Sequence, residues 1–219
     1  MLTLDEILKK YDCDKSSDFH GYGKVYDSLF LPLRDRKISL LEIGVCRGNS
    51  LRAWEEYFTR ASIHGVDILD RTKYDTKRVK THIIDQKDDR KMTDLGKKFG
   101  PFNIIIDDGE HSSKSVVRSF NSLLPFLAPG GYYIVEDLHC IPQHRGTEPN
   151  EALDFFTKLI YDINLKGVIG GKGFRKSQWW VRKTDLRKGK GFIPSEIQSS
   201  IKTIQFSIGL IIMRKFDHV

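Results

Sequence analysis

The sequence predicts an α/β fold: a mostly parallel β-sheet with helices on both faces, closed by an antiparallel hairpin. Short apolar runs such as Ile104-Ile105-Ile106 alternate along the chain with amphipathic stretches that have helical spacing. Uninterrupted β-branched runs are typical of strands buried on both faces, as in a parallel sheet. Near the end, apolar segments on either side of Ser207-Ile208-Gly209 predict the hairpin.

The elements follow one another in a regular order. Leu4, Ile7 and Leu8 predict an opening helix, and a second helix is expected from Val25 to about Leu31. Glycine, proline and polar residues separate the later elements. The predicted strands are Ser39–Ile43, Ser62–Val66, Thr81–Ile84, Phe102–Ile106 and Gly131–Val135, the last after a turn at Pro129-Gly130-Gly131. The later helices are expected at Leu51 to Phe58, Asp88 to Phe99, Val116 to Leu127 and Glu151 to Leu165.

Length and composition suit one soluble domain, residues 1–219. The chain is 39% hydrophobic and 30% charged, and its apolar runs are too short to span a membrane. Three cysteines, Cys13, Cys46 and Cys140, have no paired spacing for zinc or disulfides. The first residues lack the basic and apolar pattern of a signal peptide, so we expect a cytoplasmic protein.

Positive charge is concentrated late in the chain. The net charge is +7, and the stretch from Lys166 to Lys190 contains nine Lys or Arg residues against a single acid. We expect residues 166–198 to form a basic, lid-like insertion, because long glycine-rich loops often bind ligands. A solvated loop is the simpler alternative. The charge favours an anionic substrate, and Trp179 and Trp180 would either stack on a sugar or base or pack beneath the lid.

Acidic residues follow two neighbouring strands at the point where each strand ends. Asp107 and Asp108 follow the Ile run, and His111 comes three residues later. Glu136 and Asp137 follow the next strand. Parallel sheets bind ligands at the carboxyl ends of their strands. Unpaired carboxylates at one rim would repel one another, and a bound divalent cation would relieve that repulsion. Separate solvated acids, and a histidine that only begins a helix, are the alternatives.

A glycine turn follows the first strand and leads into a helix. Gly44 and Gly48 lie in this turn, and such turns let the backbone approach a ligand closely. Asp67 ends the second strand, 23 residues after Gly44. An acid at that place can accept hydrogen bonds from ribose hydroxyls. Capping of a helix is the alternative role for Asp67.

These segments together resemble the class I S-adenosylmethionine-dependent methyltransferase fold, a Rossmann-like seven-stranded sheet. The stretch Leu41–Gly48 is similar to the cofactor loop of that family, which usually has glycine in place of Cys46. A narrower resemblance is to the metal-dependent sugar O-methyltransferases of macrolide biosynthesis (the mycinamicin and tylosin type) and the cephalosporin hydroxylase-like group. It covers about residues 10–140. Its motifs here are Asp14-Lys15 with His20-Gly21-Tyr22, Leu41–Val45, Asp85-Gln86, Asp107–His111 and Pro129–Asp137.

The resemblance implies a division of the chain and a set of site residues. Residues 1–37 would be N-terminal helices that cover the cofactor site, residues 38–140 would be the cofactor-binding core, and the extra N-terminal domain of some members is not expected. The general base would be His111, acting beside Asp108. The magnesium ligands would be Asp108, Glu136 and Asp137. The residues that match cofactor-binding positions are Glu42, Gly44, Ser50, Asp67, Asp85, Gln86, Asp107 and Tyr22.

The expected activity is transfer of a methyl group from S-adenosylmethionine to a sugar hydroxyl with the aid of Mg²⁺. Mg²⁺ prefers oxygen ligands and lowers the pKa of a bound hydroxyl. His111 would take the proton near neutral pH, and His139 is a second candidate base. The acceptor would be a nucleotide sugar, a surface-polysaccharide residue or a glycosylated natural product. Because the resembling enzymes assemble, we expect a homo-oligomer.

Two other functions remain as alternatives. The first is a nucleic-acid methyltransferase, which only the positive charge supports. The chain lacks the Asn/Asp-Pro-Pro-Tyr/Phe motif of base-amino methylation, and the acidic rim would repel phosphates, so nucleic acid is not expected as a partner. The second is a module that binds S-adenosylmethionine without catalysis, because a fold does not determine a function.

Overall fold

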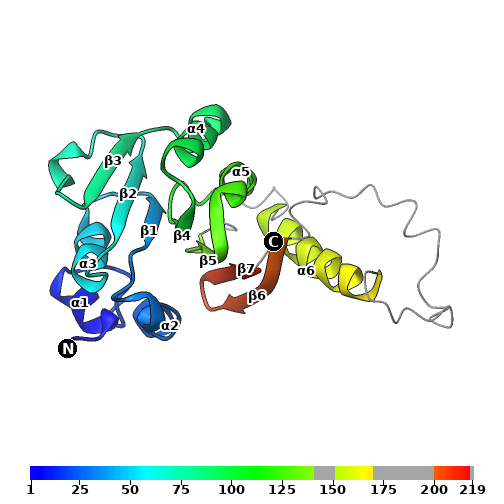
Figure 1. Cartoon of the computed structure of the whole chain (residues 1–219), viewed down its shortest axis with the longest axis horizontal. Coiled ribbons are helices and arrows are strands. Elements are labelled where there is room, and N and C mark those ends of the chain that lie inside the picture. The colour runs from blue at the N-terminus through cyan, green and yellow to red at the C-terminus, as the bar shows by residue number, and fades with distance from the viewer. Residues whose placement is uncertain (141–150, 170–199, 218–219) are drawn as a thin grey trace.

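The computed structural model describes residues 1–140, 151–169 and 200–217, and these residues contain one seven-stranded sheet (Figure 1). The strand order is β3-β2-β1-β4-β5-β7-β6. The strands are β1 (Ser39–Ile43), β2 (Ser62–Asp67), β3 (Val79–Ile83), β4 (Phe102–Asp107), β5 (Leu127–Val135), β6 (Ile201–Ser207) and β7 (Leu210–Lys215). The helices are α1 (Leu4–Lys10), α2 (Tyr22–Phe30), α3 (Asn49–Tyr57), α4 (Asp89–Phe99), α5 (Ser113–Leu123) and α6 (Glu151–Ile169). Short 3-10 turns lie at Leu31–Leu33, Thr72–Tyr74 and Leu124–Phe126.

The sheet confirms the predicted fold class. The first five strands pair in parallel, and β7 runs antiparallel to both β5 and β6. The chain builds outward from β1 through β2 to β3, then returns to place β4 on the other side of β1. This reversal leaves a crevice beyond the carboxyl ends of β1 and β4, which is where open α/β sheets bind ligands.

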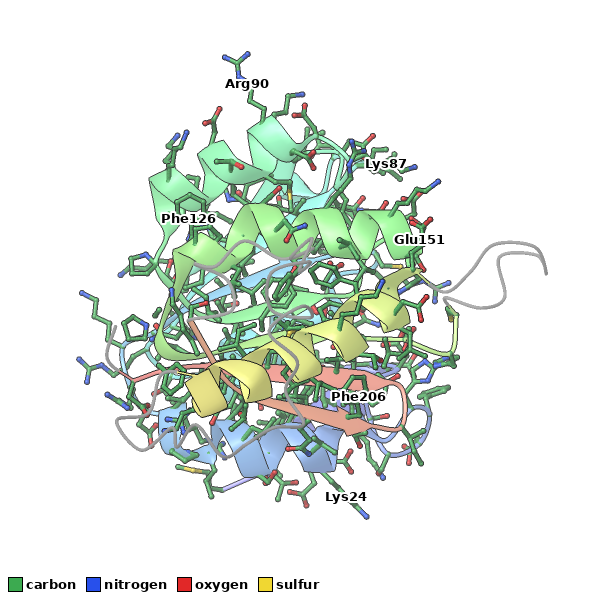
Figure 2. All side chains as sticks on the ribbon, turned by 90° about the vertical axis from the view of Figure 1, so that its right-hand side faces the viewer. Lys24, Lys87, Arg90, Phe126, Glu151 and Phe206 are labelled. Atoms are coloured by element: carbon green, nitrogen blue, oxygen red, sulfur yellow. The ribbon has the colours of Figure 1, made fainter. Side chains whose placement is uncertain are left out.

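Helices cover both faces of the sheet. On one face, α1, α2 and α3 pack on the sheet around buried residues that include Tyr26, Phe30 and Trp54. On the other face, α4, α5 and α6 pack around a second buried cluster that includes Phe120 and Phe156. Figure 2 shows α6 lying across β6 and β7, with α5 above α6 and α4 above α5 in this view.

Strand β4 supplies side chains to both clusters in alternation. Ile104 and Ile106 belong to the cluster under α1–α3, whereas Phe102 and Ile105 belong to the cluster under α4–α6. Successive side chains of a strand point to opposite faces of a sheet. Asp107 therefore falls on the α5 side, and its side chain is 1% exposed.

Some element boundaries differ from the predicted ones. The predicted turn at Pro129-Gly130-Gly131 is a bulge inside β5, because the pairing with β4 moves from Phe102–Leu127 directly to Ile104–Tyr132. The third strand begins at Val79, two residues before its predicted start, and α6 continues to Ile169.

The predicted basic insertion at 166–198 lies outside the described residues, apart from its first four, which end α6. Trp179 and Trp180 also lie outside them. Among the described residues, the structure contains no helix with the length and apolar character needed to cross a bilayer.

Candidate active site

Acidic side chains from three strand ends meet at the carboxyl edge of the sheet, around one lysine. Lys15 comes from the loop between α1 and α2, and its side chain is 2% exposed. Its Nζ atom lies 2.7 Å from Oε2 of Glu136 and 3.8 Å from Oε1 of Glu42, and it also donates to Oδ2 of Asp108. Burial opposes the charge on Lys15, but the three carboxylates outweigh it and raise the pKa of the ammonium well above its usual value.

Glu136 is held from two sides. Its second oxygen, Oε1, accepts a hydrogen bond of 2.6 Å from the hydroxyl of Tyr26, a residue that is fully buried in α2. Both oxygens of this predicted metal ligand therefore already accept hydrogen bonds, one from Lys15 and one from Tyr26. The sequence analysis assigned no role to either partner, because nothing in the sequence indicates a contact between residues more than a hundred positions apart.

Asp108, His111 and Asp137 form a more open group beside the buried lysine. Ligand atoms of these three residues lie within 4.8 Å of one another. Nε2 of His111 is 3.8 Å from Oδ1 of Asp108 and 3.9 Å from Oδ2 of Asp137. His111 and Asp137 have φ angles of 57° and 54°, in the left-handed region that side chains other than glycine rarely adopt. Such conformations concentrate at functional sites, where the surrounding structure enforces them.

Tyr22 contacts this group at Asp137. Its hydroxyl donates a hydrogen bond of 2.8 Å to Oδ1 of Asp137. The ring of Tyr22 stacks on the ring of His20 at a centroid distance of 5.3 Å. Within the described part of the chain, Tyr22 is not among the residues that line the cavity next to the site. In this structure Tyr22 orients Asp137, and its contact with the cofactor stays a prediction.

A cavity of about 530 Å³ opens beyond the ends of β1, β2, β3 and β4. A second cavity of about 340 Å³ adjoins it on the side of the α1–α2 loop. Both cavities are bordered by Asp14, Gly44, Cys46 and Asp108. The first is also lined by Asp67, Arg71, Asp85, Gln86, Gly109, His111 and Asp137, and the second by Lys15, Asn49 and Ser50. An elongated ligand fits across the two.

Asp67 organises the glycine turn after β1. Its Oδ2 atom accepts hydrogen bonds from the amides of Val45 and Cys46, at 3.2 and 3.0 Å, and from Nε of Arg71 at 3.1 Å. Its Oδ1 atom accepts from the amide of Leu69. Burial raises the pKa of Asp67, but the hydrogen bonds and the charge of Arg71 lower it by more. The pKa of Asp67 therefore lies below its usual value. Asp67 is not a helix cap, because the next helical turn begins after Arg71.

Gly44 allows a close approach between two loops of the site. Its φ angle is +91°, and a Cβ atom at this position would lie 2.0 Å from the carbonyl oxygen of Asp108. No side chain fits at that distance. The glycine therefore lets the loop that carries Asp108 pack directly against the end of β1.

Glu42 lies beneath the glycine turn and is fully buried. Its Oε2 atom accepts a hydrogen bond of 2.8 Å from the hydroxyl of Ser50, while its Oε1 atom has no hydrogen-bond partner among the described residues. Burial raises the pKa of Glu42 to about 7, although Lys15 lowers it. Glu42 lines neither cavity, so it acts on the site through Ser50 and through the nearby ammonium of Lys15.

Gln86 and Asp107 form a buried linkage beside the cavity. The amide of Gln86 donates to Oδ1 of Asp107 at 2.7 Å and to Ser119 at 2.9 Å, and its oxygen accepts from the backbone of Glu110 at 2.9 Å. Burial raises the pKa of Asp107 to about 7. Among the described residues, the cavity is lined by Gln86 and the exposed Asp85 but not by Asp107.

The residues present fit a divalent cation and an extended nucleoside-type ligand. Carboxylate oxygens of Asp108, Glu136 and Asp137 are the hard donors that Mg²⁺ prefers. Three carboxylates with a single lysine leave the cluster short of positive charge. On the cofactor side, Asp67 at the end of β2 and Gly44 at the end of β1 provide an acid and an open backbone approach.

The comparison with known proteins agrees with this geometry. Residues 41–138 match the family model described as a methyltransferase domain. This match places a methyltransferase domain at residues 41–138. The sheet order and the antiparallel closing strands are those of the Rossmann-like methyltransferase fold.

Sequence relatives of this methyltransferase domain include several sugar O-methyltransferases. Over 153 residues the chain is 44% identical to 8-demethyl-8-alpha-L-rhamnosyl tetracenomycin-C 2'-O-methyltransferase of Streptomyces olivaceus, a match that covers 64% of this chain and 40% of the relative. Over 142 residues it is 37% identical to demethylmacrocin O-methyltransferase of Streptomyces fradiae, covering 62% of this chain and 36% of the relative. The chain thus spans less than half the length of these relatives.

The chain is also similar to solved structures of a methyltransferase. The methyltransferase domain superposes on the MycE methyltransferase from the mycinamycin biosynthetic pathway, in complex with Mg and SAH, with a TM-score of 0.82 and 28% identity. This match covers 98% of the chain and 54% of MycE. The MycE complex with Mg, SAH and mycinamycin VI gives a TM-score of 0.79 at 27% identity, over 98% of this chain and 55% of MycE.

Proposed function

We propose that this protein transfers a methyl group from S-adenosylmethionine to a sugar hydroxyl of a glycosylated small molecule, with the aid of Mg²⁺. The observation that carries the proposal is the placement of His111 between Asp108 and Asp137, at the edge of a cavity of about 530 Å³. The names of the relatives support it, since they describe O-methyltransferases of rhamnosyl tetracenomycin and of demethylmacrocin. MycE, the structural neighbour, was solved with Mg and SAH.

In this proposal the metal ligands are Asp108, Asp137 and Glu136. Oδ1 of Asp108 and Oδ2 of Asp137 both face His111, and they form the open side of the group. Glu136 lies deeper, with each oxygen already accepting one hydrogen bond. A carboxylate oxygen has a further lone pair, so Glu136 can serve as a ligand while it keeps its contact with Tyr26.

The cofactor-binding residues separate into two groups. Asp67, Gly44, Asp85 and Ser50 border the two adjoining cavities, so we assign them to contact with the cofactor, Asp67 to its ribose and Ser50 to its methionine end. Gln86 also lines the larger cavity, so it can contact the cofactor while it fixes Asp107 to the loop after β4. The others act through neighbours: Glu42 supports Ser50, and Tyr22 orients Asp137.

The chemistry assigned to the chain is proton removal and alignment. S-adenosylmethionine supplies the electrophilic methyl group, and Mg²⁺ would hold the acceptor oxygen and lower the pKa of its hydroxyl. His111 takes the hydroxyl proton as the oxygen attacks the methyl carbon and the carbon–sulfur bond breaks to leave S-adenosylhomocysteine, and the carboxylates on either side stabilise the imidazolium that forms. Alignment of acceptor and methyl group supplies much of the rate.

The acceptor class, the assembly and the location of the protein belong to the same proposal. We assign a glycoside of a natural product as acceptor, from the substrates in the relatives' names. An anionic acceptor, a homo-oligomer and a cytoplasmic location remain predictions from the sequence. The division into covering helices 1–37 and a core 38–140 also remains a prediction. It is supported by the loop between α1 and α2, which supplies Lys15 to the site.

Calorimetric titration tests the proposal. S-adenosylmethionine and S-adenosylhomocysteine are titrated with and without Mg²⁺ into wild-type protein, Asp108→Asn and the control Asp94→Asn, which lies exposed on α4. We expect micromolar cofactor binding in all three proteins and Mg²⁺ binding in all except Asp108→Asn. The loaded wild type should then methylate rhamnosyl or olivosyl glycosides, the acceptors named for two of the relatives, seen as a mass gain of one methylene. Absence of cofactor binding in wild type would refute the proposal.

A further inference from the structure

Two histidines outside the proposed catalytic group lie against Asp137. His20 belongs to the loop before α2, and His139 follows β5 by four residues. Ligand atoms of His20, Asp137 and His139 all lie within 4.8 Å of one another. The two imidazole rings have a centroid distance of 5.4 Å and an interplanar angle of 40°. Neither histidine has a role in the function proposed above.

The local backbone brings these side chains together. Asp137 has a φ angle of 54°, and its carbonyl oxygen accepts a hydrogen bond of 2.8 Å from the amide of Cys140. This turn folds His139 back towards Asp137. The position of His20 is held by a hydrogen bond of 3.0 Å from its amide to the carbonyl of Asp14.

Tyr22 connects two members of the group. Its ring stacks on His20 with an interplanar angle of 18°, and its hydroxyl donates to Oδ1 of Asp137. Oδ2 of Asp137 does not carry this hydrogen bond and can face a cation. Residues that orient the ligands in this way are a usual feature of metal sites in proteins.

We propose that His20, Asp137 and His139 form a second cation site, which takes a divalent transition metal such as Zn²⁺, Co²⁺ or Ni²⁺. Two imidazoles and one carboxylate suit these ions, whereas Mg²⁺ prefers oxygen ligands alone. Atoms bound to one such ion lie at most about 4.2 Å apart, since each bond is about 2.1 Å. The ligand atoms of His20, Asp137 and His139 lie within 4.8 Å of one another, and the exposed rings of the two histidines can turn to bring them to that distance.

The site also has room for an exogenous ligand. Three protein ligands leave at least one coordination position open, as in catalytic rather than structural metal sites. Both histidines are exposed, so that position is accessible to solvent. If Asp137 also binds Mg²⁺, which rests on the proposed function, one carboxylate bridges an oxygen-rich site and a nitrogen-containing site.

Cobalt binding to the intact protein tests this site directly. Co²⁺ is titrated in the presence of millimolar Mg²⁺, and binding is followed by visible absorption and by equilibrium dialysis with elemental analysis. We expect wild type to bind one Co²⁺. His20→Ala and His139→Ala should each weaken that binding at least about 100-fold, because one of three protein ligands is lost.

Two control variants decide what a loss means. His82→Ala, which removes a half-buried histidine of β3 that packs against Phe99, should bind Co²⁺ like wild type. His111→Ala should also retain Co²⁺, which separates this site from the catalytic group. Wild-type binding by His20→Ala and His139→Ala, or loss of Co²⁺ in His111→Ala, would overturn the proposal. S-adenosylhomocysteine binding, measured on the same samples, reports the proposed function independently of the Co²⁺ result.

Discussion

Nζ of Lys15 lies 2.7 Å from Oε2 of Glu136, although the two residues are 121 positions apart in the chain. The contact joins the loop between α1 and α2 to the carboxyl end of β5. It also places a permanent positive charge inside the cluster of carboxylates that we assign to Mg²⁺. The lysine and the proposed Mg²⁺ would therefore stabilise two of the same acids, Asp108 and Glu136.

Replacement of Lys15 should make the protein depend on the metal. Lys15→Met leaves Glu136, Asp108 and Glu42 without their cation, and removal of one partner of a buried ion pair costs about 3–5 kcal/mol. Thermal unfolding in EDTA should show this loss, and Mg²⁺ should raise the Tm of the variant more than that of wild type. Lys10→Met is the control, because its ion pair with Glu56 is exposed and worth less than about 1 kcal/mol. Equal Tm values for Lys15→Met and wild type would contradict the role of Lys15.

Substitution of Gly44 should disrupt the packing of the site. In Gly44→Ala the new methyl group meets the carbonyl of Asp108 at 2.0 Å, and the φ angle of +91° adds strain. We expect a loss of at least about 3 kcal/mol in the free energy of unfolding by urea. Gly21→Ala is the matched control, since its φ angle is +75° but its Cβ would have no neighbour within 4 Å among the described residues. The free energy of unfolding of that variant should fall by only about 1–2 kcal/mol. A similar loss in both variants would show that the backbone conformation, and not the contact with Asp108, causes the destabilisation.

Asp67 should contribute strongly to cofactor affinity. Asp67→Asn removes the negative charge that organises the amides of Val45 and Cys46. Charged hydrogen bonds contribute about 1.5–3 kcal/mol, so S-adenosylhomocysteine should bind about 10–100-fold more weakly in calorimetry. Asp70→Asn, an exposed neighbour whose carboxylate accepts hydrogen bonds from Thr72, should bind normally. Unchanged affinity in Asp67→Asn would remove Asp67 from the cofactor site.

His111 should affect turnover rather than binding. His111→Gln is expected to lower kcat by about 10²–10⁴, the usual contribution of a general base. S-adenosylhomocysteine should still bind within about threefold of wild type, because Gly44, Asp67 and Ser50 are unchanged. A loss of affinity that matches the loss of rate would indicate a structural role instead. His82→Gln provides a control for the loss of a histidine elsewhere.

The paired histidines of β2 and β3 should make stability depend on pH. Nδ1 of His64 lies 3.1 Å from Nε2 of His82, and burial lowers the pKa of His64 from 6.5 to about 4. Below pH 6.5 the His64 side chain binds a proton in the unfolded chain but not in the folded protein. The free energy of unfolding therefore falls as the pH decreases from 6.5 to about 4. The slope should reach at most about 1.4 kcal/mol per pH unit.

Urea unfolding at several pH values between about 5 and 7 measures that slope. His64→Phe should flatten it, because its ring takes up no proton and keeps the contacts with Phe99 and Phe102. An unaltered slope in His64→Phe would assign the pH dependence to other groups.

Several features of the site followed from local sequence. The acids Asp108, Glu136 and Asp137 come directly after apolar strands, and parallel strands bring such ends to one edge. His111 was predicted from its distance to Asp108, and Asp67 from its place at the end of β2. The assignment of Asp107 to the cofactor stays a prediction; alternation along β4 turns its side chain towards α5, where it accepts a hydrogen bond from Gln86.

The sequence by itself determined the order of strands and helices and the acids at the sheet edge, since periodicity and strand ends are local properties. Only the tertiary structure decided that Lys15 enters the acid cluster and that His20 meets His139. Such contacts depend on how the loops pack after the sheet has formed, and a surface loop carries no periodic pattern that records its partner. The tertiary structure also decided which face of β4 each carboxylate occupies, because a shift of one residue exchanges the two faces.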